Sequence, residues 1–226
     1  MIAGGRPGYF FWMKTLFSML LLVWVSGFSL EAQGPEATTN RPARLCVALA
    51  QPGENETVAW RQGKAMWDKP ARPGYDKGQF RFPPGPLALE LRHPKRPPLA
   101  VNQKVLPGKC YLLVVDQKPN PDEKTKAQFP VVTDARWVEL PWGEPGPEPA
   151  AFAYVAAAQP ISFRMNDKAV SLAPGRVEKL AGGYMLFSDA AGNPLMDLNP
   201  SGGSYLLLVF FGDSAGKLAP VRCQYY

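Results

Sequence analysis

Three cysteines and a single histidine are the side chains of this 226-residue chain best suited to metal binding or nucleophilic chemistry. Cys46, Cys110 and Cys223 are scattered, with no CxxC pair or other metal-ligand spacing. His93 has no second histidine with which to complete a metal site, and a conventional catalytic triad would rest on it alone. The sequence therefore predicts no catalytic residue, no metal site, no cofactor and no enzyme. A hydrolase or transferase is kept as a third hypothesis, which turnover surviving the removal of His93 would favour.

Two of the three cysteines can pair if the protein reaches an oxidising compartment. Cys46 falls on the first predicted strand and Cys110 near a later strand of the same predicted module. A Cys46–Cys110 disulfide is therefore the first expectation, with Cys223 as the odd thiol. The alternative is three buried or unpaired thiols, which protein interiors tolerate well.

The densest positive cluster lies in the segment 92–98, where Arg92, Lys95 and Arg96 surround His93. Such a loop could bind a carboxylated glycan, and His93 could titrate beside the bound anion. The alternative is an exposed hairpin tip whose charges are simply solvated.

Trp67 and Trp142 are the tryptophans expected in loops or in a linker, where an indole face can stack on a sugar ring. The alternative for both is packing in a core or at a domain joint. Acidic residues such as Asp122, Glu123 and Asp189 fall in predicted turns, where the backbone's need for a nearby acceptor explains them.

The N-terminus has the pattern of an export signal. Lys14 precedes a short apolar stretch at 16–25, and a weak small-residue cleavage site ends at Ala32. This stretch is short of the about 20 residues that a membrane span requires, so we expect a cleaved signal peptide over 1–32 and no stable span afterwards. An uncleaved anchor helix is the alternative, and Met13 is an alternative start. The expected localisation is periplasmic or secreted.

The formal net charge of +6 is compatible with anionic partners. Export makes nucleic acid an improbable partner, so an anionic polysaccharide or membrane surface fits this charge better. Ordinary solubility is the alternative explanation of the same charge.

Short apolar and alternating segments separated by turn residues predict an all-β fold. Residues 161–166 alternate strictly, as do residues 87–92, whereas 111–115 and 205–211 are unbroken apolar runs typical of strands buried on both faces. Turn pairs such as Asn166-Asp167 separate these segments. We expect two β-sandwich modules of about 100 residues each.

Self-similarity along the chain supports two copies of one module. Residues 44–52 match 152–160, and residues 107–115 match 201–209 with Tyr111 aligned to Tyr205. Five ordered matches have offsets that fall from 108 to 90. The predicted organisation is a signal peptide and four further segments: 1–32, a disordered leader 33–43, module 1 at 44–140, a Pro-rich linker 141–149 and module 2 at 150–226. The linker has four prolines in nine residues, which favours extended chain.

The Pro107-Gly108-Lys109-Cys110-Tyr111-Leu112 entry into a buried strand, the Pro-rich joint and the closing segment 216–222 carry a resemblance. The chain resembles exported bacterial proteins with tandem immunoglobulin-like β-sandwiches of unassigned role. More narrowly, it is similar to the periplasmic accessory proteins of alginate O-acetylation. That resemblance implies a non-catalytic accessory or scaffold protein of the cell envelope, acting on polysaccharide modification or export through an envelope protein partner. A module that binds anionic glycans or surfaces is the alternative.

Overall fold

The computed structural model describes residues 40–50, 57–62, 65–70, 80–180, 182–200, 202–211 and 220–225. Within 57–62 and 65–70 only the side chain of Ala59 is described. The predicted signal peptide at 1–32 and most of the predicted leader lie outside the described residues. Thr38–Tyr226 forms one compact unit.

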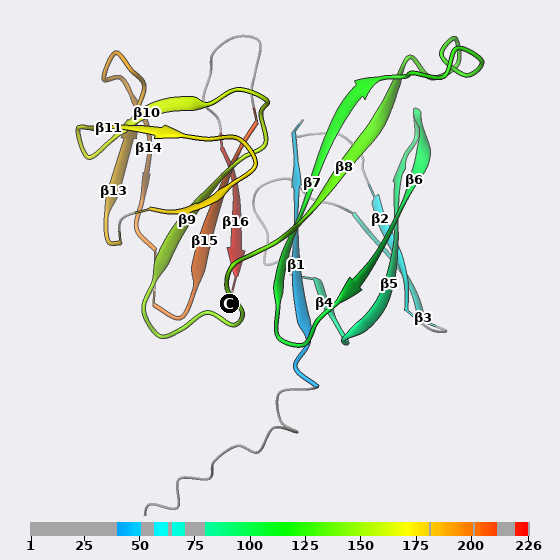
Figure 1. The fold of residues 1–226 in the computed structure, drawn as a ribbon, viewed down its shortest axis with the longest axis horizontal. Coiled ribbons are helices and arrows are strands. Elements are labelled where there is room, and N and C mark those ends of the chain that lie inside the picture. Colours follow the sequence, from blue (N-terminus) through cyan, green and yellow to red (C-terminus); the bar gives the residue numbers. More distant parts are fainter. Residues whose placement is uncertain are drawn as a thin grey trace, which may run out of the picture. The chain divides into compact units, whose positions relative to one another are not determined.

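Every helix or strand in the described part of the chain is a β-strand, which confirms the expected all-β class. The strands, all but β12 labelled in Figure 1, are β1 (Ala43–Leu49), β2 (Thr57–Gln62), β3 (Ala65–Pro70), β4 (Phe80–Phe82), β5 (Gly85–His93), β6 (Arg96–Val105), β7 (Cys110–Pro119), β8 (Val131–Glu139), β9 (Ala150–Val155), β10 (Ile161–Met165), β11 (Lys168–Leu172), β12 (Val177–Lys179), β13 (Met185–Ser188), β14 (Pro194–Leu198), β15 (Tyr205–Phe210) and β16 (Val221–Tyr225).

These strands form four four-stranded sheets. We call them sheet I (β3-β2-β5-β6), sheet II (β4-β1-β7-β8), sheet III (β12-β9-β15-β16) and sheet IV (β11-β10-β13-β14). Sheets II and III each contain one parallel pair, β1 with β7 and β9 with β15. The remaining pairings between the named strands are antiparallel.

Three buried hydrophobic clusters lie between these sheets. The first core is shared by sheets I and II, and the last core by sheets III and IV. The third cluster is shared by sheets II and III, and we call it the joint; its buried members are Cys46, Ala48, Cys110, Leu112, Val114, Leu140, Trp142, Ala150, Phe152, Tyr154, Ala156, Leu207, Val209, Val221, Cys223 and Tyr225. Sheets II and III therefore have cores on both of their faces.

Strand β7 illustrates why its sequence is an unbroken apolar run. Because successive side chains of a strand point to opposite faces, Leu112 and Val114 enter the joint while Leu113 and Val115 enter the first core. Its neighbour β1 is buried along its whole length for the same reason. The prediction of central strands buried on both faces is confirmed for β7, and β15 buries Leu207 and Leu208 in the same alternating way.

The pairing of β1 with β7 recurs in β9 with β15, including its end contacts. Gly108 donates its N–H to the Arg41 carbonyl at 3.0 Å, and Gly203 donates to the Pro147 carbonyl at 3.2 Å. Both glycines have a positive φ, of 66° and 72°. At the other end, the Ala50 N–H donates to Val115 and the Ala156 N–H donates to Phe210, at 2.9 and 2.8 Å.

These matched contacts correct the predicted alignment of the later strand. The sequence comparison aligned Tyr111 with Tyr205, but Tyr111 lies in the first core while Tyr205 packs against the joint. The repeated hydrogen bonds instead align Cys110 with Tyr205, each being the first residue of its strand. The error is one residue, and a one-residue slip moves every side chain of a strand to the other face.

The turn between β10 and β11 is the predicted one, whereas the end of the predicted leader differs from the prediction. Asn166 and Asp167 have φ values of 48° and 64° and connect β10 to β11, as the predicted two-residue turn requires. The leader was predicted to be disordered through residue 43, and this is wrong for its last residues. Ala43 is fully buried in β1, where it is in register with Phe82 of β4, and the Arg41 carbonyl accepts the Gly108 bond just before the parallel pairing with β7 begins at Arg44.

Candidate functional site

A buried arginine stands at the edge of the joint. The Arg44 side chain, only 8% exposed, donates from Nη2 to Glu144 Oε1 at 3.0 Å, and Arg41 donates to the other oxygen of Glu144 at 3.3 Å. Arg44 Nε and Nη1 are buried without a hydrogen-bond acceptor among the described protein atoms. Glu144 therefore supplies the charge that allows Arg44 to be buried there, because an isolated buried cation is costly.

Trp142 lies inside the joint, so its face is not offered to a sugar. Its indole stacks on Phe152 with ring centroids 3.9 Å apart and meets Tyr205 and Tyr225 edge-on at 5.9 and 6.0 Å. The residue is only 9% exposed. The alternative of packing at a domain joint is thus the one that the contacts favour. The ligand-stacking hypothesis for Trp142 is wrong, because the surface that it needs is already covered by aromatic rings.

The predicted Cys46–Cys110 disulfide is absent, since Cys46, Cys110 and Cys223 are all free and buried. Cys110 Sγ instead donates to the Gly143 carbonyl at 2.9 Å. Burial raises the pKa of the Cys110 thiol to about 12, with the Arg44 charge partly opposing that shift. The Cys110 thiol therefore stays protonated at neutral pH, which is the reverse of what a nucleophilic cysteine requires.

Cys46 and Cys223 come together across the joint, from β1 and β16. A hydrogen bond between their thiols, together with burial, raises the pKa of Cys223. Cys46 Sγ also donates to the Gln224 carbonyl at 3.7 Å. The sequence did not indicate this pair, because the two residues belong to different predicted modules.

The segment 92–98 forms the tip of the β5–β6 hairpin. A hairpin tip was one of the two interpretations of this segment, the other being a glycan-binding loop. Burial lowers the pKa of His93, helped by the nearby charge of Lys95. The Lys95 N–H donates to His93 Nδ1 at 3.1 Å, and Arg92 pairs with Glu90 on its own strand. Arg96 is only 7% exposed. The three cations therefore do not form one open positive surface, because Arg92 and Lys95 are exposed whereas Arg96 is buried.

Trp67 was expected in a loop, and this is wrong. It lies on β3, in register with Trp60 of β2, because residues 57–62 and 65–70 form a hairpin. The side chain of Trp67 lies outside the described residues, so its role as a stacking residue stays a prediction.

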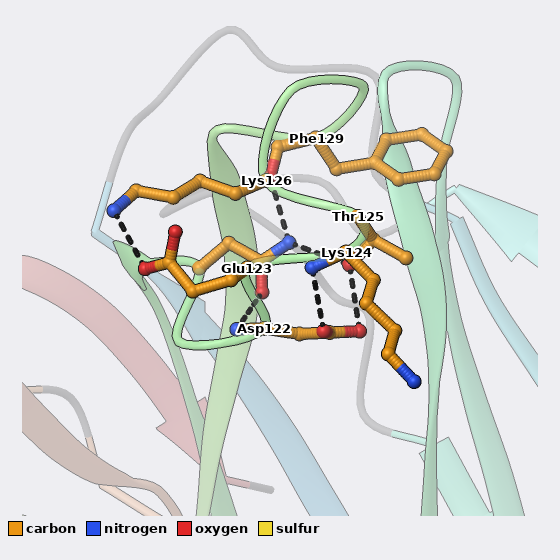
Figure 2. Close-up of polar contacts among 7 residues, drawn as sticks. Asp122, Glu123, Lys124, Thr125, Lys126 and Phe129 are labelled. Atoms are coloured by element: carbon orange, nitrogen blue, oxygen red, sulfur yellow. Dashed lines mark hydrogen bonds and ion pairs between the residues drawn. The ribbon is translucent and has the colours of Figure 1, made fainter.

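Hydrogen bonds among its own residues hold the β7–β8 loop at 120–130 (Figure 2). Asp122 accepts hydrogen bonds from the Lys124 N–H at 2.9 Å and from the Thr125 hydroxyl at 3.0 Å, and Lys126 pairs with Glu123 at 3.1 Å. Asn120 is buried and its amide donates to the Phe129 carbonyl at 2.8 Å. Asp122 thus serves the backbone of its own loop, as predicted for turn carboxylates, whereas Glu123 pairs with a side chain of the same loop.

Sheet IV presents an apolar surface beside its edge strand β14. Tyr184, Leu186 and Leu195 are 57%, 40% and 39% exposed, whereas Met185 and Phe187 point into the last core. Among the described strands, β14 pairs with β13 alone and stands at the end of the sheet order. Large exposed apolar side chains beside an open strand edge are typical of surfaces that bind extended peptides.

Within the described ranges no group of three or more histidine, cysteine or acidic side chains is arranged to hold a metal ion. None of the described segments forms a helix long and apolar enough to cross a membrane. The residues that the sequence did not single out are Arg44, Glu144 and Tyr225. For Arg44 and Glu144 a signal was available in the sequence. Glu144 is an acidic residue within the Pro-rich segment, and Arg44 is a basic residue at the start of an apolar strand, so the two could have been expected to pair.

Comparison of the chain with models of protein families finds no matching family. Comparison with curated proteins likewise finds no match.

Proposed function

We propose that this chain is an exported, periplasmic or secreted, non-catalytic scaffold protein of the bacterial cell envelope that acts in polysaccharide modification or export. In this proposal sheets I and II form one immunoglobulin-like β-sandwich module and sheets III and IV form the second. The modules follow a signal peptide at 1–32. Their task is to hold a protein partner in a fixed relation to the envelope.

The observation that carries the proposal is the joint between sheets II and III. Its apolar members are buried as completely as those of the flanking cores, with Leu112 and Leu207 both at 0% exposure. Two modules joined only by a Pro-rich linker would expose these side chains to water. Burying them together favours a single body with two working ends, which suits a scaffold better than two independent binding modules.

Specific bonds across the joint support the same interpretation. The Tyr225 hydroxyl donates to the Tyr111 carbonyl at 3.0 Å, from β16 to β7. Arg136 of β8 donates to the Ala156 carbonyl just after β9. Directional bonds of this kind fix the orientation of the two sheets, because they are lost if either sheet slides.

The partner surface in this proposal is the β13–β14 side of sheet IV. An extended segment of an envelope protein would pair with the open edge of β14 while its side chains cover Leu186 and Leu195. The basic hairpin tip and Trp142 give less support to the alternative of a glycan-binding module. Arg96 and Trp142 are buried, so two of the residues on which that alternative depends do not face solvent.

The test is a crosslinked pull-down of the tagged, full-length chain from the envelope of its own host, with partners identified by mass spectrometry. The proposal expects a stoichiometric membrane acyltransferase or polymer-export component. The variant Tyr184→Ser/Leu186→Ser should lose that partner, whereas Ser171→Ala on β11 of the same sheet should keep it. Recovery of polysaccharide that washes off in salt, without any protein partner, would favour the glycan-binding module instead.

A further inference from the structure

Cys46 and Cys223 are the two thiols that meet across the joint, and their environment suits a covalent bond. Both side chains are buried members of the joint and are free thiols in this structure, and Cys46 Sγ lies 3.7 Å from the carbonyl of Gln224, the residue next to Cys223. Strands β1 and β16 approach to within 8 Å between Cα atoms. Face-to-face sheets usually lie about 10 Å apart, so this approach is unusually close.

We propose that Cys46 and Cys223 form a disulfide bond that ties sheet II to sheet III in the oxidised protein. A disulfide requires Cα atoms about 4.4–6.8 Å apart, a range that strands within 8 Å can reach with small adjustments. Cys110 remains the free thiol, because its Sγ is directed to the Gly143 carbonyl at 2.9 Å. This pairing replaces the Cys46–Cys110 bond that was predicted on the assumption that both partners must share a module.

The reaction is a thiol–disulfide exchange with a donor disulfide. The thiolate of one cysteine attacks the donor, releasing one donor thiol and leaving a mixed disulfide. The thiolate of the second cysteine attacks the protein sulfur of that mixed disulfide, forming the Cys46–Cys223 bond and releasing the second donor thiol. Two electrons pass from the protein to the donor, and the two thiol protons end on the released donor thiols.

Burial sets the stage of folding at which this bond forms. A buried thiol exchanges slowly because it is protonated and inaccessible. We therefore expect the bond to form while the chain is folding or transiently open, and then to be enclosed by the joint. Its presence in cells rests on the proposed export to an oxidising compartment, whereas its formation in a purified sample depends on the joint alone.

The experiment uses protein purified from cells expressing the full-length chain, then unfolded, reduced and refolded with oxidised and reduced glutathione. Free thiols are alkylated and the protein is digested without reductant for peptide mapping by mass spectrometry. The expected result is a peptide pair joined through Cys46 and Cys223, with Cys110 alkylated. The oxidised protein should also melt about 5–15 °C above the reduced protein.

Cys110→Ala is the matched control, since it removes a thiol of the same cluster and should keep both the joined peptides and the difference in Tm. Cys46→Ala and Cys223→Ala should each lose both signals. A Cys46–Cys110 pair, or alkylation of all three cysteines in the refolded protein, would overturn the inference. A further outcome is that the bond forms in vitro while protein isolated from the host contains three reduced thiols. That outcome would support the disulfide site and would contradict the proposed export.

Discussion

The joint and the two cores that flank it bury different kinds of group. Among the described side chains, the first and last cores consist of hydrophobic residues, and the phenol of Tyr111 in the first core accepts a hydrogen bond from the Leu106 N–H at 2.9 Å. The joint adds the three cysteines, Trp142 and Tyr225, and it is bordered by the Arg44–Glu144 pair. A purely apolar surface tolerates sliding, whereas the bonds donated by the Tyr225 hydroxyl and the Cys110 thiol are made only at fixed positions. Trp142 Nε1, like Nε and Nη1 of Arg44, is buried without a hydrogen-bond partner among the described atoms. We infer that the flanking cores supply most of the apolar stabilisation and that the joint determines how sheets II and III are oriented.

The largest expected effect comes from Trp142→Ala. The substitution removes the stack on Phe152 and the edge contacts with Tyr205 and Tyr225, and should lower the free energy of unfolding by about 3–5 kcal/mol. Phe163→Ala in the last core, where Phe163 packs on Phe187 and Phe210, is the matched comparison with a similar expected loss. Urea unfolding followed by circular dichroism measures both. A normal midpoint for Trp142→Ala beside a lowered one for Phe163→Ala would show that the joint is not a core.

Alkaline pH should destabilise the protein through the acids buried in the joint, and Tyr111 of the first core acts in the same direction because burial raises its pKa as well. The folded-state pKa of Cys110 is raised to about 12, and burial raises that of Tyr225 as well. A raised pKa means that the folded state keeps its proton while the unfolded state loses it, so stability is complete below about pH 9 and falls as the pH rises toward about 12. Reduced protein unfolded in urea at a series of pH values gives the slope.

Cys110→Ala is the control for that slope, since it removes one of the buried acids that cause it. The free energy of unfolding should fall less steeply with pH in this variant than in the unsubstituted chain. Equal slopes would mean that the alkaline loss arises elsewhere in the protein.

A smaller loss should follow Glu144→Gln. This change removes the carboxylate that pairs with the buried Arg44, and we expect a loss of about 1–3 kcal/mol. Glu123→Gln is matched to it, because Glu123 pairs with Lys126 in an exposed position and should cost about 0.5 kcal/mol or less. Thermal unfolding of the two variants side by side makes the comparison, and equal effects would remove the special role given to Arg44.

The smallest effect is predicted for Tyr225→Phe. The ring stays in the joint while the bond from its hydroxyl to the Tyr111 carbonyl is lost, at a cost of about 1 kcal/mol. Tyr184→Phe removes a hydroxyl from an exposed ring and should leave stability unchanged. An unchanged midpoint for Tyr225→Phe would show that the bond across the joint contributes nothing to its stability.

Local patterns were enough to predict the class of the fold and several inward faces. The alternation of Leu87, Leu89 and Leu91, and that of Ile161, Phe163 and Met165, gave the faces that pack in the first and last cores. Asn166-Asp167 gave its turn because few other pairs accept two positive φ values.

The joint could not be predicted in the same way. A run such as Leu112 to Val115 indicates burial on both faces but not which sheet covers each face. The contact of Cys46 with Cys223 depends on how two sheets pack, and no local spacing encodes that. Trp142 was assigned to an exposed linker because its proline neighbours exclude a central strand, yet irregular chain can still insert a side chain into a core.

Native-state hydrogen exchange of the full chain tests the central claim most directly. If the joint unites sheets II and III, the slowest amides of β7 and β15 should exchange with the same opening free energy, equal to that of global unfolding. Trp142→Ala should lower both by the same amount. Exchange of one strand at a lower free energy than the other, or a change confined to one of them in the variant, would contradict the account.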